Sequence, residues 1–170
     1  MEQFEEGKRR SGEVLIRIYE PPDRPAVLAL HEELQAYERP LRVSRSAKPD
    51  VSNAYIREFE EQLADPDCDA SLFVAEKDDT IVGFAFCVAE EDILDDPPEQ
   101  IYLQDLTVTK TARSAGVGRS LVEAVRRFAR QRGISRINLM VLATNKDALA
   151  AYRAMGFEIA ILHLETHLSS

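Results

Sequence analysis

The chain has 170 residues, of which 45% are hydrophobic and 30% charged, and its formal net charge is −9. These values are typical of one globular domain and exclude collagen-like, low-complexity and wholly disordered proteins. The sequence contains no run of 18 apolar residues and no hydrophobic signal region, so we expect neither a membrane association nor secretion. Two cysteines without a Cys-x-x-Cys pair indicate no disulfide framework and no zinc ribbon, and they favour a cytoplasmic location.

Charge is distributed unevenly along the chain. Residues 101–136 contain eight basic and two acidic side chains, although the whole chain is acidic. The acidic total argues against nucleic acid as a partner. A basic segment in an acidic protein favours a small polyanionic ligand at that segment and a cationic partner elsewhere. For the arginines from Arg126 to Arg132, a solvated helix face is the alternative interpretation.

Hydrophobic periodicity and turn residues predict a mixed α+β domain. We expect residues 1–13 to form a flexible N-terminal segment and residues 14–168 to form the domain. The run Ile81–Ala89 is apolar on both faces, which predicts a strand in the middle of the sheet. In chain order the predicted elements are a strand over Val14–Tyr19, helices over Arg24–Tyr37 and Asn53–Ala64, strands over Ser71–Glu76, Ile81–Ala89 and Ile101–Val108, a helix over Val117–Arg132, a strand within Ile134–Leu142, a helix over Asn145–Met155 and a terminal strand within Phe157–Leu168.

One stretch between a predicted strand and a predicted helix indicates a binding function. It places Arg113, Gly116 and Gly118 in the spacing Arg-x-x-Gly-x-Gly. Glycines allow a close backbone approach or a positive φ, and the N–H groups and dipole at a helix N-terminus favour an anion. The stretch therefore predicts a diphosphate-binding turn, with a purely structural turn as the alternative. Its spacing differs from those of the P-loop and of the dinucleotide fingerprint.

A second group of residues follows downstream. Asn145 and Tyr152 lie two turns apart on one predicted helix face, and Gly156-Phe157 comes next. Together with the glycine turn, in this β-α-β-α order, residues 14–165 resemble the GNAT superfamily of N-acetyltransferases, most strongly over Ile101–Glu158. The resemblance implies a three-layer α+β sandwich, in which a mostly antiparallel mixed sheet has a splayed pair of central strands and helices on both faces. It also implies acetyl-CoA as cosubstrate and no metal.

The resemblance also implies roles for individual residues. The backbones of Leu106 and Val108 would bind the pantetheine arm, Asn145 would contact the pantetheine, and the Leu106 N–H at the bulge would stabilise the tetrahedral oxyanion. Tyr152 would lie near the thioester sulfur and act as the catalytic acid, because a phenol with a pKa of about 10 stays protonated at neutral pH and can protonate the leaving thiolate. The residues that would hold the diphosphate are Arg113, Ser114, Gly116, Val117, Gly118, Arg119 and Ser120.

The implied reaction is transfer of the acetyl group from acetyl-CoA to a primary amine by direct nucleophilic attack. The acceptor would be a cationic small amine, an antibiotic-like amine or a protein amine, bound between the Arg39–Ser52 loop, the Glu90–Glu99 loop and the C-terminal strand. A non-catalytic acyl-CoA-binding sensor of the same fold is the alternative. A homodimer is compatible with the family, but the sequence determines neither the oligomeric state, nor the acceptor, nor the acyl-chain preference.

The sequence departs from the family pattern at the expected base. Many relatives have Glu-Asp where this chain has Gln104-Asp105, and an amide cannot accept a proton. The base is therefore water, another acidic residue or none. Alternation along a strand predicts that Asp105 lies on the opposite sheet face from Gln104, in a structural role.

The histidines give weaker signals. His31 is expected on the surface of its helix. His163, Glu165 and His167 alternate along the predicted terminal strand, and these residue types can bind a metal ion. A solvated outer face is the favoured interpretation, so no metal site is predicted.

Overall fold

A computed structural model describes residues 12–42 and 44–166. The chain divides into two compact units, Met1–Met140 and Val141–Ser170, which are described separately. The predicted flexible segment 1–13 lies almost entirely outside the described residues, and the single domain over residues 14–168 stays a prediction. None of the helices in the described residues has the length and apolar character needed to cross a membrane.

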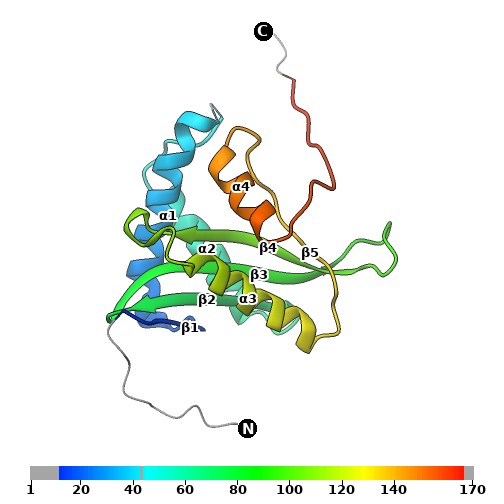
Figure 1. The fold of residues 1–170 in the computed structure, drawn as a ribbon, viewed down its shortest axis with the longest axis horizontal. Coiled ribbons are helices and arrows are strands. Elements are labelled where there is room, and N and C mark those ends of the chain that lie inside the picture. The colour runs from blue at the N-terminus through cyan, green and yellow to red at the C-terminus, as the bar shows by residue number, and fades with distance from the viewer. Residues whose placement is uncertain (1–11, 43, 167–170) are drawn as a thin grey trace. The chain divides into compact units, whose positions relative to one another are not determined.

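A five-stranded sheet forms the centre of the first unit (Figure 1). Its strands are β1 (Val14–Ile18), β2 (Ala70–Lys77), β3 (Thr80–Glu91), β4 (Glu99–Val108) and β5 (Ile137–Asn138). They lie in the order β1-β2-β3-β4-β5, and every neighbouring pair is antiparallel except β4 and β5, which are parallel. The strand that is apolar on both faces, β3, lies in the middle, as predicted. A strand with two apolar faces must be covered on both sides, which requires helices above and below the sheet.

Helices cover both faces of this sheet. Helices α1 (Arg24–Glu38) and α2 (Val51–Ala64) pack on one side, which we call the α1/α2 face, and α3 (Val117–Gln131) packs on the other (Figure 1). Phe73 turns away from the α1/α2 face by strand alternation, and its ring meets that of Phe128 on α3 at 6.3 Å. The predicted fold class is therefore confirmed. The core beneath α1 and α2 consists of Val27, Leu30, Ile56, Phe59, Leu72, Val74, Phe84 and Phe86.

The predicted loop Arg39–Ser52 is partly helical. It contains a 3-10 turn, η2 (Arg39–Leu41), and α2 begins at Val51 rather than at Asn53. The first intrahelical bond runs from the N–H of Ala54 to the carbonyl of Asp50 (3.0 Å). Ser52, expected in a polar loop, has its side chain buried in the first turn of α2. A single polar residue on a buried helix face gives no periodic signal.

The second unit contains helix α4 (Lys146–Ala154), which confirms the helix predicted over Asn145–Met155. Asn145 caps it, because its side-chain oxygen accepts a hydrogen bond from the N–H of Ala148 (3.1 Å). Gly156 follows the helix with a φ of +88°, in the left-handed conformation that commonly ends helices.

The predicted terminal strand is wrong over residues 157–166, which form neither a strand nor a helix, and residues 167–168 lie outside the described residues. The apolar side chains Ile159, Ile161 and Leu164 in this segment are exposed. Alternating apolar residues form a strand only where a neighbouring strand pairs with their backbone groups. In the described residues no strand pairs with this segment.

Candidate cofactor and acceptor site

Among the described residues, strand β4 is paired along only one edge for most of its length. Its antiparallel pairing with β3 runs from Glu99 to Val108, whereas its parallel pairing with β5 comprises only Ile101 and Tyr102. The pairing ends at Tyr102, in agreement with the splayed pair of central strands that the resemblance implied. The open edge of β4 offers backbone N–H and C=O groups to a ligand, as an unpaired strand edge does.

The direction of the backbone groups along this edge follows from one hydrogen bond. The N–H of Thr109 donates to the carbonyl of Val82 over 2.9 Å, so Thr109 faces β3. Because successive residues of a strand direct their backbone groups to opposite edges, those of Leu106 and Val108 point to the open edge. This is the orientation that binding a pantetheine arm through these two residues requires.

A β-bulge interrupts β4 beside the open edge. Phe86 of β3 pairs with Asp105, but the next residue, Cys87, pairs with Leu103, which leaves Gln104 as the extra residue. The irregularity therefore lies two residues before Leu106, the residue whose N–H is expected at the bulge.

The bulge brings two neighbouring side chains to the same face. The Tyr55 hydroxyl, on α2, donates a hydrogen bond to Asp105 Oδ2 (2.9 Å) and accepts one from Gln104 Nε2 (3.3 Å). The prediction that Asp105 faces away from Gln104 is therefore wrong, because the extra residue breaks the alternation of the strand. Sequence reasoning missed Tyr55 altogether, since a tyrosine on an amphipathic helix is usually a core residue.

Burial and neighbouring charges perturb the ionisation of this cluster. The pKa of Asp105 is raised to about 7, mainly by burial and to a smaller extent by Glu38, against the lowering effects of the Tyr55 hydrogen bond and of Arg45. Burial and the neighbouring Asp105 raise the pKa of Tyr55, so the phenol stays protonated. Arg45 itself pairs with Glu38. The cluster thus holds a carboxyl group that titrates near neutral pH, which is a common feature of functional sites.

His31 lies beneath this cluster and not on the surface, so that expectation is wrong. Its side chain is 1% exposed, its ring centroid is 4.8 Å from that of Tyr55, and its Nε2 lies 3.3 Å from Nε2 of Gln35. Burial, and then the charge of Arg45, lower the pKa of His31 to about 4. The imidazole is therefore neutral at neutral pH. The next residue in the sequence, Glu32, is exposed, so the local sequence does not reveal that His31 points inward.

The turn between β4 and α3 has a backbone suited to an anion. After the 3-10 turn η3 (Lys110–Ala112), Ser114 and Gly116 take positive φ angles of +66° and +79°. The first helical bond of α3 runs from Ser120 to the carbonyl of Gly116 (3.0 Å). The N–H groups in the first turn of a helix lack partners within the helix, and the helix dipole adds positive potential there.

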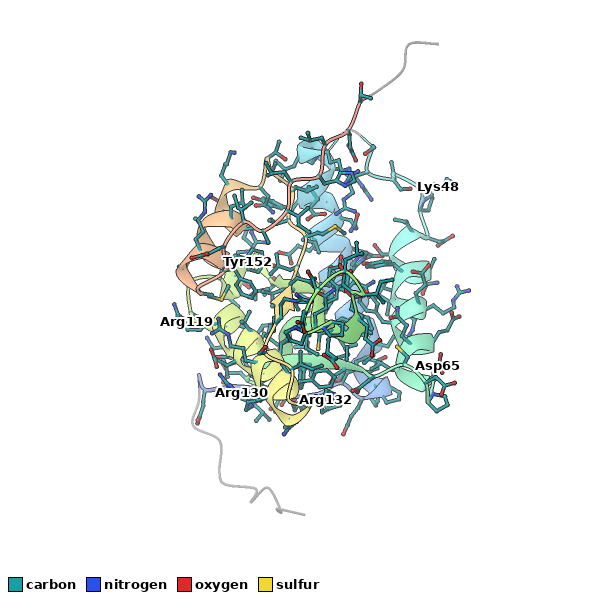
Figure 2. The ribbon with its side chains drawn as sticks, turned by 90° about the vertical axis from the view of Figure 1, so that its right-hand side faces the viewer. Lys48, Asp65, Arg119, Arg130, Arg132 and Tyr152 are labelled. Carbon is teal, nitrogen blue, oxygen red and sulfur yellow. The ribbon has the colours of Figure 1, made fainter. Side chains whose placement is uncertain are left out.

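Gly118 lies beside the end of β4. A Cβ atom at this position would be 3.8 Å from Val108 Cγ2, an ordinary contact, so packing within the protein does not require glycine here. A ligand lying directly against the backbone of the turn would require glycine at this position. Val117 is buried under the turn, whereas Arg119 is exposed at the N-terminal end of α3 (Figure 2).

Two side chains hold this turn against α1. Glu33 accepts a hydrogen bond from Thr109 Oγ1 (2.9 Å) and one from the N–H of Lys110 (2.8 Å). Arg113 donates from Nε to the carbonyl of Val108 (3.1 Å), and its guanidinium carbon lies 5.3 Å from the centroid of the Tyr37 ring. The Arg113 side chain thus contacts the strand end and α1, in addition to any charge it offers to a diphosphate.

The remaining predicted site residues lie in the second unit. The oxygen of the Asn145 side chain caps α4, as described above. Tyr152 packs its ring edge-on against Phe157, with 5.6 Å between the ring centroids and 76° between the planes. The N–H of Phe157 donates to the Tyr152 carbonyl (3.0 Å). Within this unit α4 and the turn after it therefore hold the tyrosine backbone and ring.

Comparison with known proteins assigns this architecture to a family. The sequence profile of the acetyltransferase (GNAT) family matches residues 27–157, which is more than half of the chain. The chain belongs to the GNAT family. The match spans the open edge of β4, the glycine turn and α4.

Individual GNAT proteins resemble this one at moderate identity. "Probable N-acetyltransferase camello" of Xenopus laevis is 27% identical over 127 residues, which are 75% of this chain and 52% of that protein. The chain therefore spans about half the length of the curated relatives that it matches. Two solved structures share the fold: AAC(6')-Iy with a CoA-containing bisubstrate analogue (21% identity, 93% and 99% coverage, TM-score 0.73), and a Clostridium acetobutylicum protein described as a "predicted acetyltransferase with acetyl-CoA" (16% identity, 91% and 96% coverage, TM-score 0.71).

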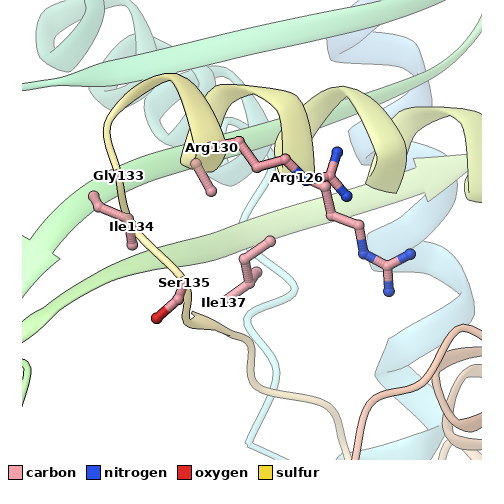
Figure 3. Close-up of a pocket in the computed structure, with 7 residues that line it drawn as sticks. Arg126, Arg130, Gly133, Ile134, Ser135 and Ile137 are labelled. Carbon is pink, nitrogen blue, oxygen red and sulfur yellow. The ribbon is translucent and has the colours of Figure 1, made fainter.

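This GNAT protein also has a surface hollow of about 470 Å³ at the other end of α3 (Figure 3). The rise of a helix places it about 20 Å from the glycine turn. The Arg126 side chain pairs with Glu123, and Arg132 nearby pairs with Asp69. Two arginines of the run Arg126 to Arg132 thus have acidic partners within the protein. The hollow is lined by Arg126, Ala129, Arg130, Gly133, Ile134, Ser135 and Ile137.

In residues 12–42 and 44–166 no group of three or more His, Cys, Asp or Glu side chains is arranged to hold a metal ion. His163 Nε2 lies 3.8 Å from Glu165 Oε1. The third residue of that pattern, His167, lies outside the described residues.

Proposed function

We propose that this GNAT protein transfers the acetyl group of acetyl-CoA to a primary amine of a cationic acceptor. The observation that carries the proposal is the continuity of two features: the open edge of β4 leads directly into the glycine turn that begins α3. An extended pantetheine arm would pair with the first, and the diphosphate attached to it would lie against the second. The acetyl-CoA and bisubstrate complexes named above support the choice of cosubstrate.

The end of β4 and the turn after it have separate roles in binding. Leu106 and Val108 would pair with the amide groups of the pantetheine as a neighbouring strand does. The positive φ angles at Ser114 and Gly116, and the first turn of α3 through Val117, Gly118, Arg119 and Ser120, would direct N–H groups at the diphosphate. Arg113 would add charge, and the resemblance assigns Asn145 a contact with the pantetheine. No metal is needed for this recognition, because backbone N–H groups and arginines supply the positive charge.

The reaction needs stabilisation of two developing charges. As the amine attacks, the thioester carbonyl becomes an oxyanion, which the N–H of Leu106 would stabilise; such a donor contributes about 3 kcal/mol. As the C–S bond breaks, the sulfur becomes a thiolate, to which Tyr152 would transfer its phenolic proton. The direction of the Leu106 backbone toward the open edge of β4 supports the first assignment.

Charge supports a cationic acceptor. The protein as a whole carries −9, and the α1/α2 face beside the bulge contains the Asp105 carboxyl, while the nearby Glu38 pairs with Arg45. The net negative charge of the protein attracts an ammonium group, and attraction of this kind raises both encounter rate and specificity. The aminoglycoside-derived analogue bound to AAC(6')-Iy shows one amine class that this fold accommodates, so aminoglycosides belong in any acceptor panel.

The test measures binding and turnover separately. Saturation with acetyl-CoA at 100 times Kd should stabilise the protein by about 2.7 kcal/mol, which a thermal denaturation series detects. Release of free thiol from acetyl-CoA is then followed with lysine, spermidine and sisomicin as acceptors. Gly118→Glu serves as the variant with a blocked turn. Stabilisation without thiol release would favour the acyl-CoA sensor, and the absence of any stabilisation would contradict both functions.

A further inference from the structure

We propose that Asp105 accepts the proton of the acceptor amine and that Tyr55 positions its carboxylate. The proposal rests on the proposed function and names the base that the sequence left open when Gln104 replaced the expected glutamate. It follows from the bulge in β4, which turns Asp105 to the face where Gln104 and Tyr55 lie.

The position of Asp105 in the chain fits this role. It directly precedes Leu106, whose N–H points to the open edge of β4, and its side chain lies on the α1/α2 face. A base and an oxyanion donor on consecutive residues are held at a constant separation by the strand. The assignment requires that the amine approach the thioester from the α1/α2 face, where the carboxylate lies. Proton removal at that point produces the lone pair that attacks.

One hydrogen bond fixes the carboxylate, and a second fixes the hydroxyl that donates it. Tyr55 donates to Oδ2 over 2.9 Å, and Gln104 in turn donates to the Tyr55 oxygen over 3.3 Å. The Tyr55 ring is itself held between His31 and Phe59, with centroid distances of 4.8 Å to both. Rigid support of this kind keeps a catalytic group within the narrow geometric range that proton transfer needs. Gln104 thus acts through Tyr55, although it cannot accept a proton itself.

Several charged and titratable groups lie around Asp105 or around the Tyr55 ring that contacts it. They are His31 and Glu38 on α1, Arg45 in the following loop, Tyr55 on α2 and Tyr102 on β4. His31 is neutral at pH 7 because its pKa is low, and Tyr55 and Tyr102 stay protonated because theirs are raised. Glu38 and Arg45 act in opposite directions on Asp105, so the balance leaves burial as the main cause of its pKa near 7. A base with such a pKa is well matched to neutral pH.

The protons and electrons of the reaction balance with these groups. The ammonium of the acceptor gives one proton to the Asp105 carboxylate, and the nitrogen lone pair forms the C–N bond. The tetrahedral adduct then collapses, the C–S bond breaks, and the sulfur takes the Tyr152 proton. The nitrogen of the new amide gives up a second proton, which restores the Tyr152 phenol, and Asp105 releases its proton to water. The products are the acetylated amine, free CoA thiol and one proton.

The test compares pH profiles of thiol release for wild type, Asp105→Asn and Tyr55→Phe, with whichever of lysine, spermidine and sisomicin the wild type acetylates. The wild-type kcat/KM should rise through an apparent pKa near 7. In Asp105→Asn, kcat/KM at pH 7 should fall by about 100-fold. The rise through a pKa near 7 should also disappear, so that the rate follows deprotonation of the free amine. The Kd for acetyl-CoA, measured by calorimetry, should be unchanged. Asp69→Asn, which removes a carboxylate at the Arg132 ion pair, is the matched control and should keep the wild-type profile.

Tyr55→Phe provides a second, milder readout. In the wild type the hydrogen bond from Tyr55 lowers the pKa of Asp105. Loss of this bond in Tyr55→Phe should therefore move the acid limb of the pH profile to higher pH, while turnover at high pH is retained. A purely structural role for Tyr55 would change stability without moving the limb. If Asp105→Asn kept the wild-type rate and the wild-type acid limb of the pH profile, the proposal would be overturned. If that variant does not fold, an unmoved limb in Tyr55→Phe would overturn it. A wild type that binds acetyl-CoA but acetylates none of the three amines would instead contradict the proposed function, and this assignment with it.

Discussion

Glu33 and Thr109 connect helix α1 to the end of strand β4, with 2.9 Å between the carboxylate Oε2 and the hydroxyl Oγ1. The second carboxylate oxygen accepts the N–H of Lys110 over 2.8 Å. The turn that leads to Gly116 therefore begins at a point held by α1. A residue 76 positions away in the sequence thus contributes to the geometry of the proposed diphosphate site.

Removing this connection should weaken cofactor binding. Hydrogen bonds to a carboxylate contribute about 1.5–3 kcal/mol each, and part of this energy holds the turn in its binding conformation. For Glu33→Ala we expect the Kd for acetyl-CoA to rise about tenfold, which corresponds to about 1.4 kcal/mol. Calorimetric titration measures it, with Glu32→Ala as the control, since Glu32 is an exposed neighbour on the same helix. Equal affinities of the two variants would show that α1 does not position the turn.

Gly118 offers a comparison between two substitutions. Gly118→Ala adds a Cβ that lies 3.8 Å from Val108 Cγ2, so the free protein should unfold at a nearly unchanged temperature. Gly118→Glu should fold similarly but lose the thermal stabilisation by acetyl-CoA, because its carboxylate brings bulk and negative charge to the first turn of α3. Thermal denaturation with and without acetyl-CoA measures both effects. Full stabilisation of the glutamate variant would place the diphosphate elsewhere.

Tyr152→Phe tests the proposed acid without changing the shape of the ring. Loss of a general acid typically costs a factor of about 10² to 10⁴ in rate. We expect kcat to fall by about 100-fold while the Kd for acetyl-CoA stays within twofold of wild type, since the hydroxyl makes its contribution only as the thiolate leaves. The edge-on contact with Phe157 is preserved in this variant. An unchanged kcat would exclude Tyr152 as the proton donor.

Asp105 should also make the stability of the protein depend on pH. Its folded-state pKa of about 7 lies above the ordinary value of 3.8. Between pH 4 and pH 7 the folded state therefore binds more protons than the unfolded state, and this group's contribution to the free energy of unfolding falls as pH rises. Asp105→Asn lacks this titration, so its stability relative to wild type should increase from pH 4 to pH 8. Urea denaturation at these pH values measures the difference, and a constant difference would contradict the raised pKa.

His31 should act in the opposite direction. Its folded-state pKa of about 4 lies below the ordinary value of 6.5. The unfolded state therefore binds more protons between these pH values, and the contribution of His31 to stability is lost as pH falls from 6.5 to 4. His31→Gln should flatten the acid side of the stability curve. Above pH 7 the imidazole is neutral in both states, so there the substitution should change stability only through packing, by an amount that does not depend on pH. The same denaturation series measures this, and an equally steep acid loss in the variant would contradict a buried neutral imidazole.

Much of the fold could be predicted because its signals are local. The apolar positions of α1, α3 and β3 recur with the period of the element that they form, and Gly116 and Gly156 mark a helix start and a helix end. Alternation failed at the terminal segment, since Ile159 and Ile161 alternate but have no pairing strand in the described residues. A strand depends on a partner, whereas a helix satisfies its own backbone.

From its sequence alone this chain could be assigned its fold class, the glycine turn before α3 and the tyrosine on α4, because each depends on residues close together in the chain. The tertiary structure alone decided which way Asp105 faces and what it meets. A single extra residue at Gln104 changes the face of the next side chain, and Tyr55 reaches that side chain from 50 positions away. Pairing registers and contacts between distant elements arise only when the whole sheet is assembled, so no local pattern records them.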